Sequence, residues 1–296
     1  MTELTRRPFG NTGLQVSVLG LGGGQVGKSD LPEAVAERLL NQALDLGINL
    51  IDTARGYGLS EARIAKYLGH RRQDVVLSTK VGYGVAGVND WTPDAVRLGV
   101  DEALTKLQTD WIDIVHLHSC SLEILRRGDV ITALDDARQG GKIRVAAYSG
   151  ENEALDYAVS SGRFQAVQTS ISLADQRNLD RALPATQTGG LGVIAKRPVA
   201  NAPWRFETRP YGNYAEEYWY RWQAMDLNPR GLDWQELALR FTAYLPGVHT
   251  SIVGTANVDH LLEDVRLVAR GPLPVDQVDE IRAAFRAHDE DWTGLT

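Results

Sequence analysis

Four side chains that could together move a proton follow short apolar segments of the sequence. Asp52 ends one segment and Tyr57 follows it after a short loop, Lys80 ends the next segment, and His118 ends the one after that. An ion pair with Asp52 would hold the Lys80 ammonium, and an ammonium beside a phenol favours phenolate, lowering the pKa of Tyr57 from about 10. Such a tyrosine can give a proton to a carbonyl oxygen or take one from an alcohol, while His118 hydrogen-bonds the same oxygen.

Each of these residues has a plainer interpretation when it is taken alone. An aspartate at a strand end is more often a cap or a loop anchor, an isolated lysine is usually a solvated surface residue, and a histidine after an apolar run is usually a hydrogen-bonded structural residue. Tyr57 lies between Gly56 and Gly58 and could simply fill a turn. Four compatible groups at the ends of consecutive segments favour a site over four separate structural roles.

The elements that would position these residues alternate regularly along the chain. Short β-branched runs that are apolar on successive residues are typical of strands buried on both faces, and they occupy residues 18–21, 48–52, 75–80, 112–118, 143–148, 166–169, 191–195 and 250–253. Stretches of helical periodicity lie between them, at residues 32–46, from Ser60, from Thr92-Pro93, and at 129–139, 151–161, 178–188, 233–244, 258–270 and 275–288. Ser60 is predicted to cap its helix, and Thr92 to cap the next one with Pro93 in the first turn.

Eight strands alternating with eight helices, followed by a last helix at 275–288, predict a parallel sheet with right-handed crossovers. At 296 residues a closed (β/α)8 TIM barrel, forming a single domain over 1–296, is the economical arrangement because closure removes the sheet edges. An open, doubly wound sheet is the alternative, but the glycine-rich run 19–24 lacks the dinucleotide fingerprint. Residues 1–17 lie outside the repeat and predict a hairpin that closes the bottom of the barrel. Residues 198–231 form a long aromatic loop after the seventh strand, and long loops at this end of a barrel usually carry function.

Composition excludes several other classes of protein. The formal net charge is −7, and the hydrophobic and charged fractions of 43% and 23% are ordinary for a globular chain. No apolar run is long enough to span a membrane, and the first ten residues lack the apolar stretch of a secretory signal, so we expect a cytoplasmic protein. Cys120 is the only cysteine, which excludes an intrachain disulfide. The acidic balance argues against nucleic acid as a partner, and we expect no metal site.

Motifs spread over residues 8 to 265 resemble those of the aldo-keto reductase family. Singly they are weak, but they come in the family's order. They are Leu14-Gln15-Val16-Ser17-Val18-Leu19-Gly20-Leu21-Gly22, Ile51-Asp52-Thr53-Ala54, Gly56-Tyr57-Gly58, Ser60-Glu61, Leu77-Ser78-Thr79-Lys80, Asp113-Ile114-Val115-His116-Leu117-His118, Gly140-Gly141-Lys142-Ile143-Arg144, Ser149 and Ala166-Val167-Gln168. The resemblance implies a barrel enzyme that interconverts carbonyls and alcohols by direct hydride transfer with NADP or NAD.

The resemblance also assigns roles to individual residues. The family's catalytic tetrad corresponds to Asp52, Tyr57, Lys80 and His118, in agreement with the set chosen from the residues alone. His118 matches rather than His116, because the pattern places the histidine five residues after an aspartate. The groups that hold the nicotinamide carboxamide are implied at Ser149 and Gln168. Further cofactor-binding positions are assigned to Gly23, Gly24, Asp52, Lys196, Arg197, Gly254, Thr255, Asn257, Glu263 and Asp264.

The sequence departs from the family pattern at two places around the nicotinamide. Gly150 follows Ser149 where the family often has an asparagine, so one carboxamide contact is lost or comes from Asn152. At the end of the seventh strand, where the family commonly has an aromatic residue that stacks on the nicotinamide, the chain reads Ala195-Lys196-Arg197-Pro198. A stacking ring would therefore come from elsewhere, for example from Trp204. Lys196 and Arg197 stand there instead. They could contact the pyrophosphate, or one of them could pair with a surface carboxylate.

The segment that resembles the adenosine-binding stretch is poor in positive charge. Gly254 and Asn257 stand where basic residues often hold the 2′-phosphate of NADP, and His260 is the one candidate cation there. A phosphate dianion without Arg or Lys partners lacks charge-assisted hydrogen bonds worth about 1.5–3 kcal/mol each. The sequence therefore predicts weak discrimination between the cofactors, or use of NAD.

Two other functions remain open, as do the substrate, its direction of conversion and the oligomeric state. A barrel that binds nicotinamide could act mainly as a regulatory or partner subunit, with the aromatic loop 198–231 as its docking surface. A lyase or isomerase could instead use Lys80 to form a Schiff base, although the Asp52 and Tyr57 partners argue against this.

Overall fold

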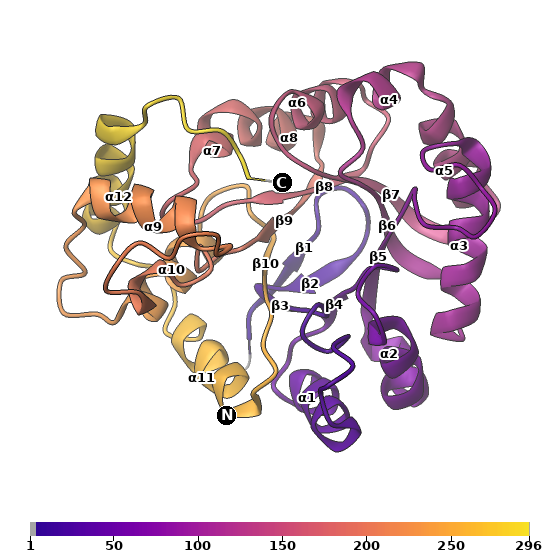
Figure 1. Cartoon of the computed structure of the whole chain (residues 1–296), viewed down its shortest axis with the longest axis horizontal. Helices are drawn as coiled ribbons and strands as arrows, with labels where there is room; N and C mark the ends of the chain where they lie inside the picture. The colour runs from indigo at the N-terminus through magenta and orange to yellow at the C-terminus, as the bar shows by residue number, and fades with distance from the viewer. Residues whose placement is uncertain (1–3, 296) are drawn as a thin grey trace.

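The computed structural model describes residues 4–295, and its centre is a closed barrel of eight parallel strands surrounded by helices (Figure 1). The prediction of a (β/α)8 barrel is confirmed, while a single domain over the whole of 1–296 stays a prediction because residues 1–3 and 296 lie outside the described residues. The strands follow the order β10-β3-β4-β5-β6-β7-β8-β9 around the barrel. They are β3 (Leu19–Gly22), β4 (Leu50–Asp52), β5 (Val76–Val81), β6 (Ile112–His118), β7 (Ile143–Ser149), β8 (Ala166–Ser170), β9 (Gly192–Lys196) and β10 (Thr250–Val253).

The helices form the outer ring of the barrel, as Figure 1 shows. They are α1 (Glu33–Asp45), α2 (Ser60–Leu68), α3 (Pro93–Leu107), α4 (Leu122–Arg127), α5 (Asp129–Gln139), α6 (Asn152–Ser160), α7 (Arg177–Arg181), α8 (Leu183–Gly189), α9 (Glu216–Met225), α10 (Trp234–Ala243), α11 (Val258–Val268) and α12 (Val275–His288). Two short 3-10 helices, η1 (Gly69–Asp74) and η2 (Pro203–Arg205), complete the helical elements.

Two helix predictions need correction, and two helices have no counterpart in the prediction. The stretch 178–188 is two helices, α7 and α8, which meet at Ala182 just before Pro184, a residue that suits a first helical turn but not a helix interior. Ser60 is not an N-cap, because its hydroxyl accepts a hydrogen bond from Thr53 instead of from a backbone amide. The short helix α4 and the helix α9 were not predicted. Thr92 caps α3 as predicted, accepting from the amide of Ala95.

A hairpin closes the bottom of the barrel, as predicted. Its antiparallel strands are β1 (Arg6–Pro8) and β2 (Gln15–Ser17), and Phe9 lies in the turn between them. The ring of Phe9 is fully buried in an apolar cluster inside the barrel, with Leu50, Val76 and Ile114. Burying a ring of this size here stabilises the fold by about 1.5–3 kcal/mol and excludes water from the lower half of the barrel.

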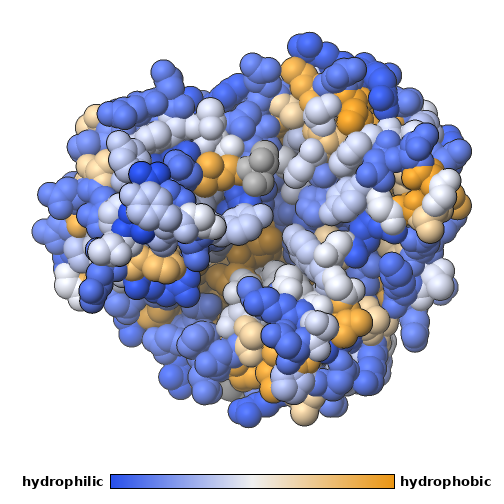
Figure 2. Space-filling model, viewed as in Figure 1, coloured by the Kyte–Doolittle hydropathy of each residue, from blue (hydrophilic) through white to orange (hydrophobic). Residues whose placement is uncertain are grey.

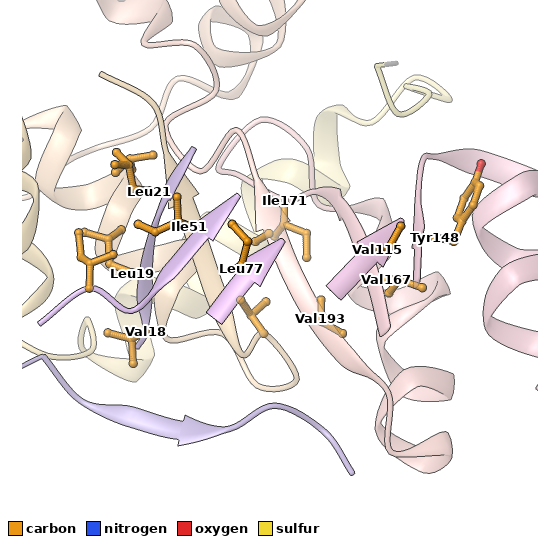
Figure 3. Close-up of a cluster of buried hydrophobic side chains, with 14 of the residues drawn as sticks. Val18, Leu19, Leu21, Ile51, Leu77, Val115, Tyr148, Val167, Ile171 and Val193 are labelled. Atoms are coloured by element: carbon orange, nitrogen blue, oxygen red, sulfur yellow. The ribbon is translucent and has the colours of Figure 1, made fainter. Parts of the chain in front are cut away.

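Alternate residues of each strand point to different sides of the barrel wall. Leu77 of β5 and Val115 of β6 lie in the larger core between the strands and the helices (Figure 3), whereas Val76 and Ile114 lie in the inner cluster. This period of two fixes which residues reach the barrel interior at the upper ends of the strands.

The loop after β9 and the C-terminal segment lie over the upper, C-terminal face of the barrel. The loop 198–231 contains η2 and α9, and the end of the chain crosses toward the centre in Figure 1. The guanidinium of Arg197 donates to the carbonyl of Leu295 at 2.5 Å, and that of Arg221 donates to the carbonyl of Thr293 at 2.8 Å. Within residues 4–295 no helix is both long and apolar enough to cross a membrane.

Candidate active site

Strand alternation brings a set of polar residues together inside the upper half of the barrel. Asp52 lies two residues beyond the buried Leu50 and therefore on the same side of β4. The strand register places Asp52 beside Ser78 and Lys80 beside His116. The inward positions at the upper strand ends are Asp52, Ser78, Lys80, His116, His118, Ser149, Gln168 and Lys196.

Asp52 and Lys80 form a buried ion pair at the centre of this set. The ammonium nitrogen of Lys80 lies 2.6 Å from Asp52 Oδ2, and each side chain is 2% exposed. Lys80 also donates to the Thr53 carbonyl at 2.8 Å, while Ser78 Oγ donates to Asp52 Oδ1 at 2.8 Å. Burial alone would raise the pKa of Asp52, but the Lys80 charge and the hydrogen bonds outweigh it and hold that pKa below its usual value.

Tyr57 lies directly over this ion pair. The Lys80 ammonium is 5.1 Å from the centre of the Tyr57 ring, and the rings of Tyr57 and His118 meet edge to face at 6.3 Å between centres. The backbone around Tyr57 is fixed by Gly27, whose carbonyl accepts from the amide of Leu59. A Cβ on Gly27 would lie 1.7 Å from the Tyr57 carbonyl oxygen, so only glycine allows the two backbones to approach this closely. The structure therefore brings all four predicted catalytic residues together.

The two histidines of β6 are both uncharged at neutral pH. Burial lowers the pKa of His118 to about 3, with the Lys80 ammonium adding to the effect, and burial lowers that of His116 to about 4. His116 Nε2 lies 3.1 Å from Ser78 Oγ, so His116 belongs to the network beneath the ion pair. His118 lies two residues further along β6, on the same side of the strand, and lines the inner cavity with Tyr57.

Two adjoining cavities open above these residues, at the central hollow seen in Figure 2. The inner cavity has a volume of about 390 Å³ and is lined by Gly22, Gly24, Gln25, Asp52, Tyr57, Lys80, His118, Ser119, Ser149, Gln168, Lys196, Arg197, Tyr214, Ile252 and Gly254. The outer cavity has a volume of about 780 Å³ and shares Gln25, Arg197, Tyr214, Ile252 and Gly254 with the inner one. Its other lining residues include Trp204, Arg205, Thr255, His260, Glu263 and Asp264.

An elongated dinucleotide fits this pair of cavities. The inner cavity is lined by the four predicted catalytic residues, and the outer cavity provides space for a second large ring system. The Arg197 side chain lies between them, where a guanidinium suits a pyrophosphate.

Most of the predicted cofactor-binding residues line one of the two cavities. Gly24, Ser149, Gln168, Lys196 and Arg197 line the inner cavity. Gly254, Thr255, Glu263 and Asp264 line the outer one, and burial raises the pKa of Asp264 to about 6. Two of the predicted residues line neither cavity. Gly23 packs behind the cavity wall against Ser60, and the side chain of Asn257 caps α11.

Several of these side chains form hydrogen bonds or ion pairs with other side chains of the protein. Ser149 Oγ donates to Gln168 Oε1 at 3.0 Å, and Gln168 Nε2 donates to Asp52 Oδ1 at 3.0 Å. Lys196 pairs at 3.1 Å with Glu151, a fully buried carboxylate rather than a surface one. This carboxylate also accepts from the backbone amide and the side chain of neighbouring residues on β8, so it is well satisfied.

The structure explains the departure at Gly150. A Cβ on Gly150 would lie 2.2 Å from the hydroxyl oxygen of Tyr148, which bonds to the Cys120 carbonyl. No asparagine can stand at this position while Tyr148 lies there. The Asn152 amide, which was the proposed substitute, instead exchanges two hydrogen bonds with the backbone of Gly294.

Trp204 does not reach the inner cavity. It lines the outer one and stacks on Trp234 with 6.3 Å between ring centres. The exposed ring of Tyr214, which was not predicted to belong to the site, lines both cavities.

Other site residues were also missed in the sequence. Gln25 and Ser119 line the inner cavity, and Tyr83 bonds to His118. Ser119 follows His118 directly, so its place at a strand end was a usable signal. Tyr83 lies three residues beyond Lys80, and no periodicity indicated its direction.

The family model of the aldo/keto reductase family matches residues 18–286. The chain belongs to the aldo/keto reductase family. Among curated proteins, this aldo/keto reductase is 33% identical to an L-galactose dehydrogenase of Arabidopsis thaliana over 68% of its chain and 67% of that protein. It is 26% identical to an uncharacterised oxidoreductase of Bacillus subtilis over 96% of its chain and 99% of that one.

Solved structures agree with this assignment. A holo aldo-keto reductase of Bacillus halodurans superposes with a TM-score of 0.82 at 27% identity, covering 95% of this chain and 96% of that one. This aldo/keto reductase is thus an NAD(P)-dependent oxidoreductase that acts on carbonyl and alcohol groups, and its cofactor is NADP or NAD.

Proposed function

We propose that this enzyme interconverts an aldehyde, ketone or aldose and the corresponding alcohol, with Tyr57 as general acid and base. The observation that carries the proposal is the Lys80 ammonium, fixed by Asp52 and held 5.1 Å from the centre of the Tyr57 ring at the floor of the inner cavity. A positive charge at this distance stabilises the phenolate that forms when Tyr57 gives up its proton.

The nicotinamide, when bound, supplies the hydride for reduction and accepts it in oxidation. In the reducing direction the Tyr57 hydroxyl gives its proton to the carbonyl oxygen, and in the oxidising direction it takes the proton from the alcohol. His118 donates a hydrogen bond to the same oxygen and so orients the substrate. Asp52 keeps Lys80 in place, which prevents the ammonium from turning toward solvent.

We propose that the cofactor extends from the inner into the outer cavity. Ser149 and Gln168 would hold the carboxamide, and Arg197 the pyrophosphate. Glu263 and Asp264 both line the outer cavity, where carboxylates suit a ribose 2′-hydroxyl and repel a 2′-phosphate. This supports use of NAD, or weak discrimination between the two cofactors.

A binding titration followed by a substrate screen tests the proposal. Quenching of tryptophan fluorescence gives the dissociation constants for NADH and NADPH, and aldehydes, ketones and aldoses are then screened in both directions. With NADH deuterated at C4, the label should appear on the carbinol carbon of the product. Cofactor binding without turnover on any member of the panel would overturn the proposal and favour a regulatory or partner subunit. A preference for NADPH above about a hundredfold would contradict the role of the two carboxylates.

A further inference from the structure

A second tyrosine, Tyr83, contacts His118 from the side away from the inner cavity. The Tyr83 hydroxyl lies 2.9 Å from His118 Nδ1, and the two rings lie 5.5 Å apart between centres. We propose that Tyr83 is a positioning residue that fixes His118 in the tautomer with its proton on Nε2, and thereby sets which ring nitrogen can donate to the substrate oxygen. The effect of this tautomer on the reaction rests on the proposed function, whereas the assignment of the proton to Nε2 does not.

The direction of this hydrogen bond follows from the two partners. A neutral imidazole has one N–H and one basic nitrogen, and the hydrogen bond made by one nitrogen decides which of them carries the proton. A phenol hydroxyl is a strong donor and a weak acceptor, because its lone pair is drawn into the ring, so it pairs best with the basic nitrogen. Within residues 4–295 the Tyr83 hydroxyl has no other hydrogen-bond partner. Tyr83 therefore donates to Nδ1, which leaves the proton on Nε2.

Tyr83 and His118 are both uncharged near neutral pH. Burial raises the pKa of Tyr83, with Tyr57 adding to the effect, and burial lowers that of His118 to about 3. A charged imidazolium, which would donate from both nitrogens, is therefore absent near neutral pH. The choice between two neutral tautomers then depends on the hydrogen bond to Tyr83.

The other nitrogen of His118 is the one available to a substrate. Nε2 has no hydrogen-bond partner within the described chain, although His118 lines the inner cavity beside Tyr57. Tyr83 is not among the residues that line this cavity, so Nδ1 points away from it. A donor at Nε2 and the Tyr57 hydroxyl can then reach one oxygen atom from two sides.

The loop after β5 holds Tyr83 in place before any ligand binds. Gly82 has a φ of +124°, and a Cβ there would lie 2.1 Å from the ring of Trp91, so the indole occupies space that only glycine leaves free. The Trp91 amide donates to the Gly82 carbonyl at 2.7 Å, and its ring lies 5.9 Å from that of Tyr83. The loop is fastened further by Arg55, which donates to the Gly84 carbonyl at 2.7 Å and pairs with Glu102 at 2.9 Å.

Nitrogen-15 spectroscopy of the imidazole rings tests the tautomer directly. The full chain, labelled with [15N]histidine, is recorded at pH 7 without cofactor, and the His118 signals are assigned by their loss in His118→Gln. We expect a proton-bearing Nε2 and an unprotonated Nδ1, and in Tyr83→Phe a shift of both signals toward the average of two tautomers. Tyr244→Phe, which removes a phenol hydrogen bond to the Val268 carbonyl far from this loop, should leave the His118 signals unchanged. A proton on Nδ1 in the wild type, or unchanged signals in Tyr83→Phe, would overturn the proposal.

Kinetics then separate this positioning role from the proposed function. Loss of one neutral hydrogen bond predicts that kcat falls about 3- to 10-fold in Tyr83→Phe, with the dissociation constant of the cofactor unchanged. Tyr244→Phe should keep the wild-type kcat. If the wild type turns over no carbonyl at all, the proposed function fails while the spectra still decide the tautomer. If the wild type is active and Tyr83→Phe equals it in kcat, the link between tautomer and catalysis is refuted.

Discussion

Replacing Asp52 by asparagine should destabilise the protein strongly, because it leaves the Lys80 ammonium buried without its counter-ion. The two side chains are 2% exposed and 2.6 Å apart, so water cannot replace the lost charge. Breaking a buried pair by removing one partner costs about 3–5 kcal/mol. For 296 residues, at an unfolding entropy of about 2.1 cal/mol/K per residue, we expect a fall in melting temperature of roughly 5–8 °C.

An exposed ion pair provides the matched control. Asp101 pairs with Lys142 at 2.5 Å, but both side chains are 47% exposed. Asp101→Asn should therefore cost no more than about 1 kcal/mol, since solvent screens such pairs. Replacing both members of the buried pair, as Asp52→Asn with Lys80→Met, should recover part of the loss, because no unpaired charge remains.

Urea unfolding, followed by tryptophan fluorescence, measures these differences. The pKa of Asp52 is lower in the folded than in the unfolded chain, so its stabilisation is complete above the unfolded value of about 3.9 and is lost as the pH falls through the folded value. The gap between wild type and Asp52→Asn should accordingly be full at pH 7 and shrink below about pH 4. Equal costs for Asp52→Asn and Asp101→Asn at pH 7 would refute the description of the site as a buried, dry ion pair.

Three further outcomes follow from local geometry and burial. Gly82→Ala should lower the free energy of unfolding by about 1–3 kcal/mol more than Gly87→Ala. Both glycines have a positive φ, but only Gly82 faces a side chain, that of Trp91. Equal losses for the two variants in urea titrations would contradict the packing described. Cys120, whose pKa burial raises to about 12, should stay unmodified by iodoacetamide at pH 8 until the protein unfolds, as mass spectrometry can show. His116 and His118 take up their protons at a higher pH in the unfolded chain than in the folded chain. The free energy of unfolding should therefore fall as the pH drops from about 6.5 toward 4, and it should fall less steeply with pH in His118→Gln.

The barrel, and the grouping of the four candidate residues at one end of it, could be predicted because both depend on short periodic patterns. Each strand is a compact apolar run, and Asp52, Lys80 and His118 end three such runs in succession. The carboxyl ends of parallel strands meet on one face, so the position of each residue along its strand sufficed to bring these groups together. Tyr57 could be placed because its loop is too short to carry it far from β4.

The missed features depend on contacts between distant segments, which no local pattern reveals. The buried partner of Lys196 is Glu151, at the start of another crossover, and the exposed Tyr214 reaches both cavities from within a long loop. The packing of Trp91 on Gly82 orients the Tyr83 side chain toward His118. The sequence predicts an aromatic loop over 198–231 and does not indicate the helix α9 within it.

The central claim is that Tyr57 transfers the proton, and the most direct test is stopped-flow oxidation of bound NADH by an active carbonyl substrate in Tyr57→Phe. The phenylalanine ring keeps the shape of the cavity and removes only the hydroxyl. We predict that the dissociation constant of NADH stays at the wild-type value while the rate of NADH oxidation falls by about a hundredfold to ten-thousandfold. A Tyr57→Phe enzyme that oxidises NADH within about threefold of the wild-type rate would contradict the mechanism.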